Sequence, residues 1–207
     1  MKKSLSAELV EVARWMGEQG WCSATSGNLS ARIDENDVLI TISGRHKAHL
    51  TEQDFLLVDL DGKPLDCRST PSAETLLHTQ LYRLDNRINA VLHSHSVAAT
   101  VVSRMNTGSE LLLSGYEMQK ALSGNHSHLP QIRIEIMDND QDMKRLAGAL
   151  AHRWQREPLR WGLLIRGHGL YAWGKDVGEA RRHLEGLEFL LACEMEMNRF
   201  SHKGIGA

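Results

Sequence analysis

His93 and His95 are the two residues whose type and spacing indicate chemistry most directly. Residues 90–95 have the apolar content of a β-strand, and side chains two positions apart on a strand project to the same face. Two imidazoles on one face form a chelate for a divalent metal. Histidines that only form hydrogen bonds at a strand end have the same spacing, so the pair by itself leaves both interpretations open.

A catalytic Zn²⁺ usually has three protein ligands and one position for water or substrate, so the pair needs a third ligand. His168 is the best candidate, because Gly167 and Gly169 flank it. Glycines remove side-chain bulk and allow the backbone to approach closely, which a crowded metal site requires. We therefore expect a divalent metal at His93, His95 and His168.

A second pair with the same spacing, His126 and His128, lies in a polar stretch that ends at Pro130. This composition predicts a loop, without the fixed geometry of a strand. Imidazole ligands suit zinc, iron, cobalt and manganese, so the residues do not select the ion.

Two acidic residues are candidates for acid–base chemistry. Glu117 stands three positions before Lys120 on a predicted helical segment, and this spacing also fits a solvent-exposed ion pair. Glu74 stands near the start of a predicted helix, where a negative charge also favours the helix dipole. Spacing alone favours the structural interpretation for both residues.

Small polar residues recur at positions that favour binding of an anion. Residues 23–30 are small and polar and predict a loop whose backbone N–H groups surround an oxyanion. Candidate donors to a phosphate are Asn28, Ser43, Gly44 and Ser72, although ordinary turns have the same composition. Arg45 and Lys47 add positive charge beside Ser43 and Gly44.

The elements that position these residues alternate between helices and strands in an irregular order. Apolar spacing predicts helices over 4–19, 75–82, 97–105, 142–155 and 176–199, and a short helical segment over 115–122. It predicts strands over 37–42, 55–59, 90–95, 131–137, 163–166 and 170–173. This order indicates an α/β/α sandwich whose sheet is not simply parallel.

The composition is that of one ordinary globular domain over residues 1–207. The chain has 24 basic and 26 acidic residues, interspersed along its length, so no broad cationic surface is expected for nucleic acid. No apolar run is long enough for a membrane span, and the N-terminal residues lack the pattern of a signal peptide. The three cysteines, Cys22, Cys67 and Cys193, are an odd number at wide spacings, which does not indicate a set of disulfides and suits the reducing cytoplasm.

Five separated runs together resemble the class II aldolase/adducin family, in the same order and spacing over nearly the whole chain: Thr25-Ser26-Gly27-Asn28, Ser43-Gly44, Pro71-Ser72-Ala73-Glu74, His93-Ser94-His95-Ser96 and Gly167-His168-Gly169. The resemblance implies a three-layer α/β/α sandwich with a mixed, mostly antiparallel central sheet. It implies one Zn²⁺ per subunit on His93, His95 and His168. It also implies a homotetramer with sites near the subunit interfaces.

Within the family, the chain is most similar to members that dehydrate a ketose phosphate, through residues 115–120, 138–142 and 170–174. This resemblance implies that Glu117 is the acid–base residue and that the loops hold the phosphate. Glu74 is the second candidate, because the family's aldolases place a catalytic carboxylate there. Ala73 departs from the serine often found in those aldolases, which removes one possible phosphate donor.

The expected reaction is a metal-assisted dehydration of a ketose phosphate. A metal that polarises the C2 carbonyl acidifies the C3–H bond, a base removes the proton, and the C4 hydroxyl leaves with proton assistance. The first alternative is a retro-aldolase or epimerase that acts on another ketose phosphate and depends on Glu74. The second is a non-catalytic, adducin-like module, for which three histidines and two carboxylates have no evident use.

Overall fold

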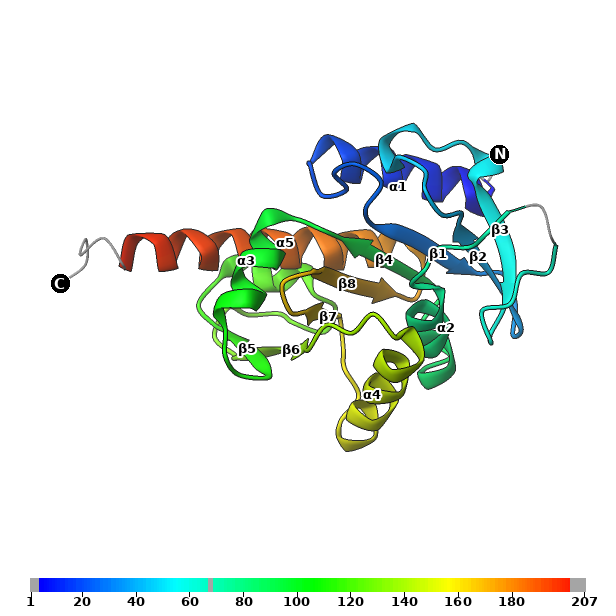
Figure 1. Ribbon diagram of the computed structural model, residues 1–207. Coiled ribbons are helices and arrows are strands. Elements are labelled where there is room, and N and C mark those ends of the chain that lie inside the picture. The colour runs from blue at the N-terminus through cyan, green and yellow to red at the C-terminus, as the bar shows by residue number, and fades with distance from the viewer. Residues whose placement is uncertain (1–3, 67–68, 202–207) are drawn as a thin grey trace.

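The computed structural model describes residues 4–66 and 69–201, which form one eight-stranded sheet with helices on both faces (Figure 1). The strands are β1 (Asn28–Arg32), β2 (Asp37–Thr41), β3 (Phe55–Asp59), β4 (Ala90–Ser94), β5 (Glu110–Leu113), β6 (Ile132–Met137), β7 (Gly162–Ile165) and β8 (Gly169–Gly174). The α-helices are α1 (Leu5–Glu18), α2 (Thr75–Leu84), α3 (Val97–Met105), α4 (Met143–Arg156) and α5 (Val177–Ser201). Three short 3₁₀ helices are η1 (Lys47–His49), η2 (Glu52–Asp54) and η3 (Glu117–Ala121).

The sheet is mixed and mostly antiparallel, as the family resemblance implies. The strand order is β3-β2-β1-β4-β8-β7-β6-β5, and only β6 and β7 pair in parallel. The neighbours β4 and β8 pair antiparallel, with His93 opposite Tyr171. This pairing brings the end of β4 beside the start of β8.

Two hydrophobic cores lie on opposite faces of the sheet. One core joins α1, α3 and α5 to the sheet through residues such as Leu9, Val102 and Leu184. The other joins α2 and α4 to the opposite face through residues such as Leu77 and Leu150. The two cores give the α/β/α layering that the order of elements predicts.

Local interactions fix the chain where β4 ends. The backbone N–H of His95 donates to the carbonyl oxygen of Trp21 at 2.7 Å. Ser96 then caps α3, because its hydroxyl accepts from the backbone N–H of Ala99 at 2.9 Å. The chain therefore changes from strand to helix immediately after the histidine pair.

Three predictions of secondary structure are corrected. The predicted loop over 23–30 ends earlier, because β1 begins at Asn28 and its small polar side chains are buried. The sequence pattern did not indicate β5, a short edge strand. The helical segment predicted over 115–122 is the 3₁₀ helix η3.

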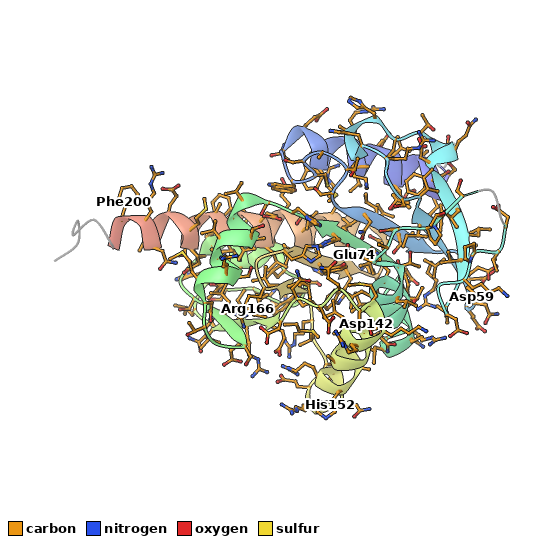
Figure 2. All side chains as sticks on the ribbon, viewed as in Figure 1. Asp59, Glu74, Asp142, His152, Arg166 and Phe200 are labelled. Atoms are coloured by element: carbon orange, nitrogen blue, oxygen red, sulfur yellow. The ribbon has the colours of Figure 1, made fainter. Side chains whose placement is uncertain are left out.

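The last helix, α5, extends beyond the body of the fold at its C-terminal end (Figures 1 and 2). Phe189 and Phe200 on this helix are about half exposed. No helix among the described residues has the length and apolar content that crossing a membrane requires. Cys22 and Cys193 are free thiols, and Cys67 lies outside the described residues.

Candidate metal centre

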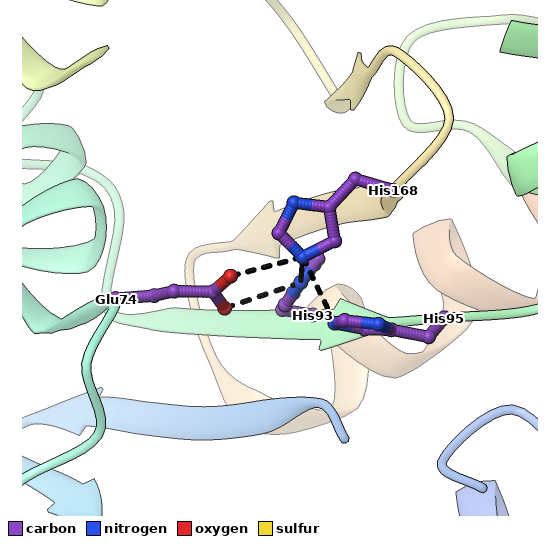
Figure 3. Close-up of side chains that lie close together, drawn as sticks. All are labelled: Glu74, His93, His95 and His168. Atoms are coloured by element: carbon purple, nitrogen blue, oxygen red, sulfur yellow. Dashed lines mark hydrogen bonds and ion pairs between the residues drawn. The ribbon is translucent and has the colours of Figure 1, made fainter. Parts of the chain in front are cut away.

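Four side chains from three separate segments converge beside the end of β4 (Figure 3). His93 is on β4, His95 directly follows it, His168 precedes β8, and Glu74 precedes α2. Each offers one ligand atom, and these atoms all lie within 4.8 Å of one another. The structure thus brings together the three predicted ligands and one of the two predicted carboxylates.

The spacing of these atoms fits a tetrahedral ion. Nε2 of His168 lies 3.1 Å from Nε2 of His95 and 3.3 Å from Nε2 of His93. The carboxylate of Glu74 lies 2.9 Å from Nε2 of His168 and 3.2 Å from Nε2 of His93. Ligands about 2.0–2.1 Å from a tetrahedral ion stand roughly 3.3 Å apart, so the donor set fits a divalent metal.

The surroundings of His93 fix which of its nitrogens faces the cluster. Its Nδ1–H donates to the carbonyl oxygen of Leu170 at 3.0 Å, which leaves the lone pair of Nε2 for a metal. The ring of Tyr171 stacks on His93 with the centroids 3.8 Å apart. Burial lowers the pKa of His93 well below its ordinary value, and it lowers the pKa of His95 to about 4. Both rings are therefore neutral, the form that binds metals.

Gly169 permits the close approach of the segment that carries His168. A Cβ atom at this position would lie 2.0 Å from the backbone oxygen of Ser94 and 3.1 Å from the ring of His93. No side chain fits there. Close backbone approach is the property that the sequence suggested for the glycines beside His168.

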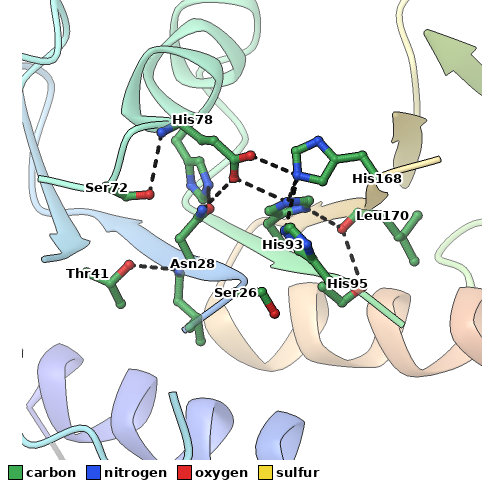
Figure 4. A network of polar contacts seen from close by, with 12 residues as sticks. Ser26, Asn28, Thr41, Ser72, His78, His93, His95, His168 and Leu170 are labelled. Atoms are coloured by element: carbon green, nitrogen blue, oxygen red, sulfur yellow. Dashed lines mark hydrogen bonds and ion pairs between the residues drawn. The ribbon is translucent and has the colours of Figure 1, made fainter. Parts of the chain in front are cut away.

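Glu74 is a half-buried residue at the N-cap of α2, but its carboxylate does not cap the helix. Burial by itself raises the pKa of this carboxyl. Its contacts with His93, His168 and Asn28 outweigh that effect and hold the pKa below the ordinary value. Glu74 is therefore an ionised carboxylate that faces the imidazoles (Figure 3), beside the polar contacts of Asn28 and His78 (Figure 4).

A buried chain of hydrogen bonds supports Glu74. Nδ2 of Asn28 donates to Glu74 at 2.6 Å, and Oδ1 of Asn28 accepts from Nε2 of His78. Burial lowers the pKa of His78 to about 4, so its ring is neutral and Nδ1 accepts from the hydroxyl of Ser30 at 2.7 Å. Tyr82 in turn donates to Ser30 at 2.7 Å. The sequence placed His78 among residues with surface or satisfied roles and gave no signal of this network.

An open depression of about 520 Å³ lies beside the cluster. His95 and His168 line it together with Thr100, and the loop after β6 contributes Asn139 and Gln141. Ser23 and Ser26, in the loop before β1, also line it. A small ligand in this space reaches the histidines and the loop before β1.

The predicted phosphate residues lie on neighbouring loops. The backbone N–H of Ser43 donates to Thr70 at 2.9 Å, and the N–H of Ser72 donates to Thr41 at 3.2 Å, so the loops after β2 and before α2 are joined. Gly44 has a φ of +77°, and a Cβ atom there would meet open space. Asn28 differs from the others, because both ends of its amide already bind Glu74 and His78.

Glu117 lies outside the cluster in this chain. Its side chain is 71% exposed, forms an ion pair with Lys120, and lies 3.5 Å from Nδ1 of His128. The Lys120 contact is the ion pair that the spacing predicts, and it lowers the pKa of Glu117. His126 and His128 lie in a loop, as predicted, and neither belongs to the metal cluster found among the described residues.

Comparison with known protein families gives one match over most of the chain. The family described as "Class II Aldolase and Adducin N-terminal domain" matches residues 7–195.

Two curated relatives are similar over nearly the full length. A methylthioribulose-1-phosphate dehydratase of Yersinia enterocolitica is 56% identical over 188 residues, which cover 91% of this chain and 90% of the relative. A protein of the same description from Serratia proteamaculans is 54% identical over 188 residues, with 91% and 92% covered. Among solved structures, an L-fuculose-1-phosphate aldolase from Thermus thermophilus aligns with a TM-score of 0.76 and 27% identity, over 96% of this chain and 97% of that one.

Proposed function

The chain belongs to the class II aldolase/adducin family, and from this premise we propose that it is a metal-dependent hydro-lyase that dehydrates methylthioribulose 1-phosphate. The observation that carries the proposal is the identity of 54–56% to methylthioribulose-1-phosphate dehydratases across about nine-tenths of both chains. The intact histidine and glutamate cluster supports it. The product is 2,3-diketo-5-methylthiopentyl 1-phosphate, an intermediate of methionine salvage. The free thiols of Cys22 and Cys193 suit a cytoplasmic enzyme.

The metal that we propose is one Zn²⁺ per subunit on His93, His95 and His168. Three neutral imidazoles at tetrahedral spacing support this assignment, although other divalent transition ions accept the same ligands. When bound, the ion supplies Lewis acidity at the substrate carbonyl and lowers the pKa of the neighbouring C–H bond. Glu74 faces the same position and is the second catalytic candidate.

Side chains and loops of the protein bind the substrate phosphate and transfer the proton. We assign the phosphate to the loops that carry Ser43, Gly44 and Ser72, with Asn28 at their base. The open space above Gly44 and the adjacent position of the loops support this assignment. The residue that takes the C3 proton then returns a proton to the departing C4 hydroxyl, so one carboxyl group serves both steps.

Glu117 is the carboxyl group that we propose for this proton transfer, and it acts in the site of a neighbouring subunit. Within one chain, Glu117 forms an ion pair with Lys120 and lies near His128, both at the surface. A position on an exposed segment suits a residue that completes a site across an interface. The subunit arrangement that we propose is a homotetramer.

Exposed apolar residues near α5 support an assembly. The 3₁₀ helix η3, which carries Glu117, packs on α5. Val97 is 70% exposed and borders the same surface cavity as Phe189. Phe200 adds apolar surface on the projecting end of α5. Contiguous exposed apolar surface is typical of an interface.

A retro-aldolase or epimerase of another ketose phosphate is the second candidate function. The position of Glu74 against the histidines favours it, because this carboxylate needs no second chain to reach the metal. The similarity to the L-fuculose-1-phosphate aldolase also favours it. A non-catalytic module gives no account of the converged ligands.

Product analysis tests the proposal. We expect the zinc-loaded protein to convert methylthioribulose 1-phosphate to the dicarbonyl product, and to leave fuculose 1-phosphate and ribulose 5-phosphate unchanged. Mass spectrometry distinguishes the outcomes, because dehydration removes one water, aldol cleavage gives two fragments, and epimerisation conserves the mass. Two fragments or an isomer would replace the proposal with the second candidate.

A further inference from the structure

Lys47 is a buried cation to which the proposed chemistry gives no role. The residue is only 2% exposed. Its Nζ donates to the carbonyl oxygen of Thr25 at 2.8 Å and to that of Arg45 at 2.7 Å. An ammonium group has three donors, so two of them hold two different loops and one remains.

Among the described residues, no carboxylate forms an ion pair with Lys47 within 4 Å of its Nζ. Burial lowers the pKa of Lys47, while the more distant Cys22 and Glu74 raise it. An ammonium removed from water without an ion pair is costly, and a bound anion would offset that cost.

The loop in front of Lys47 has the geometry of an anion site. Gly44 adopts a left-handed conformation with a φ of +77°, and the space above it is open. The backbone N–H groups of Gly44 and His46 donate to no acceptor in the part of the chain that the structure describes. The carbonyl of Arg45 points to Lys47, and in a trans peptide the following N–H, that of His46, points the opposite way. Free backbone N–H groups close to a left-handed residue form an anion-binding concavity.

The charge of Lys47 interacts with groups of the metal centre. The charge of Lys47 contributes to the lowered pKa of His95, and Glu74 is among the groups that raise the pKa of Lys47. The second loop that Lys47 holds contains Ser26, which lines the depression beside the histidines. In a ketose 1-phosphate the phosphate is one carbon away from the C2 carbonyl, so a ligand with its carbonyl at the histidines brings its phosphate to these loops.

Arg45 is the other cation of the segment, and its environment is different. Its guanidinium side chain is 61% exposed and pairs with Asp54 at 3.2 Å. We propose that Lys47, and not Arg45, is the cation of the phosphate subsite: its ammonium charge attracts the phosphate from beneath the loops after β2 and before β1, and its hydrogen bonds hold their carbonyls away from the anion. The proposal deepens the proposed function and rests on it for the identity of the whole substrate.

The test measures binding of inorganic phosphate to the metal-loaded protein by titration calorimetry. We expect Lys47→Met to raise the dissociation constant for phosphate roughly 10- to 100-fold, because the substitution removes a charge-assisted interaction. The effect of ionic strength on phosphate binding should also become smaller. Arg45→Met, the matched loss of the neighbouring cation, should change the constant less than about threefold, the size of effect typical of an exposed pair.

A second variant separates the charge of Lys47 from its structural contacts. Lys47→Gln keeps amide donors for the loops but removes the charge, so it should lose phosphate affinity as Lys47→Met does. If Lys47→Met does not fold, Lys47→Gln is compared with Arg45→Met in its place. Phosphate binding within threefold of the unmodified protein in the glutamine variant, or an equal loss in Arg45→Met, would overturn the proposal. A different outcome is that the unmodified protein binds phosphate, loses that binding in both Lys47 variants, and yet fails to dehydrate methylthioribulose 1-phosphate. That result would refute the proposed function and leave the phosphate subsite in place.

Discussion

Glu74 and Glu117 are acidic residues at the starts of the helices α2 and η3, and the structure surrounds them in different ways. Glu74 contacts two imidazoles and the amide of Asn28, and a buried chain of hydrogen bonds continues from there to Tyr82. Glu117 extends into solvent and contacts Lys120 and His128 at the surface. Glu74 is held by contacts within one chain, whereas we propose that Glu117 completes its environment at the surface of a neighbouring subunit.

This difference separates two parts of the chemistry. Metal binding depends on rigid, desolvated ligands, and one chain supplies them all. We propose that proton transfer in the dehydration depends on Glu117, which would reach the substrate of a neighbouring subunit in the assembly. Variants of the metal cluster and of Glu117 should therefore have different effects on metal content and turnover.

The largest effect is expected when the metal loses a ligand. His168→Ala leaves two histidines and Glu74 around an open position, so we expect bound metal to fall close to zero and kcat/KM to fall at least about 1000-fold. Metal content measured by mass spectrometry after gel filtration checks the first outcome. His126→Ala is the matched control, because that exposed histidine belongs to the other His-x-His pair. Full metal content in His168→Ala would show that the cluster does not hold the ion.

Loss of Glu117 is expected to affect turnover and leave the metal in place. Removal of a positioned acid–base group costs roughly 100- to 10,000-fold, so Glu117→Gln should reduce kcat by a factor in that range. The bound metal should be unchanged, because Glu117 contacts Lys120 and His128 at the surface and is not part of the metal cluster found among the described residues.

Mixed oligomers test whether Glu117 acts across an interface. Co-expressed Glu117→Gln and His168→Ala subunits carry complementary defects, so about one quarter of randomly assembled sites receive an intact histidine set from one chain and an intact glutamate from the next. Activity well above either variant alone is the expected result. Mixed oligomers as inactive as the parents would place both residues in the site of one chain.

A smaller effect on turnover is expected at Glu74. Glu74→Gln keeps the hydrogen-bonding shape and removes the charge, so we expect metal affinity to fall roughly 10- to 100-fold. With saturating metal, kcat should fall less than in Glu117→Gln. The reverse order of the two losses would favour the aldolase or epimerase alternative, in which Glu74 carries the proton transfer.

The sequence alone predicted those parts of the site that leave a local pattern in the order of residues. The spacing of His93 and His95 and the glycine beside His168 identified the three histidines that converge in the structure, because strand geometry and close backbone approach each leave a local pattern. The apolar run of β3 gave its bounds, and so did the helical spacing of α3.

The supporting network left no such pattern. Asn28 and Ser30 look like loop residues because they are small and polar, but they are buried on β1 and bind His78 from a helix 48–50 residues away. Their polarity is satisfied by residues that come close only in the folded chain. The start of β1 and the role of His78 therefore depend on tertiary contacts that a single sequence does not display.

The smallest effect that we predict concerns stability, and it tests how the buried side is held. Burial lowers the pKa of His78 from the ordinary 6.5 to about 4 in the folded chain. Between these values the unfolded chain takes up a proton at this residue and the folded chain does not, so a fall in pH favours unfolding. His78 should therefore reduce the free energy of unfolding by up to about 1.4 kcal/mol for each pH unit in that window.

Urea unfolding measures the contribution of His78 to the pH dependence of the free energy of unfolding. The unmodified protein and His78→Gln are compared at several pH values in this window. The variant should be less stable near neutral pH, because it loses the hydrogen bond with Ser30, but its stability should decline less steeply as the pH falls. Acid release of the metal occurs in both proteins and cancels in the difference. His152→Gln, an exposed histidine on α4, should leave the slope unchanged (Figure 2). Equal slopes for the unmodified protein and His78→Gln would mean that His78 is protonated in the folded chain, and its Nδ1 would then donate to Ser30 instead of accepting from it.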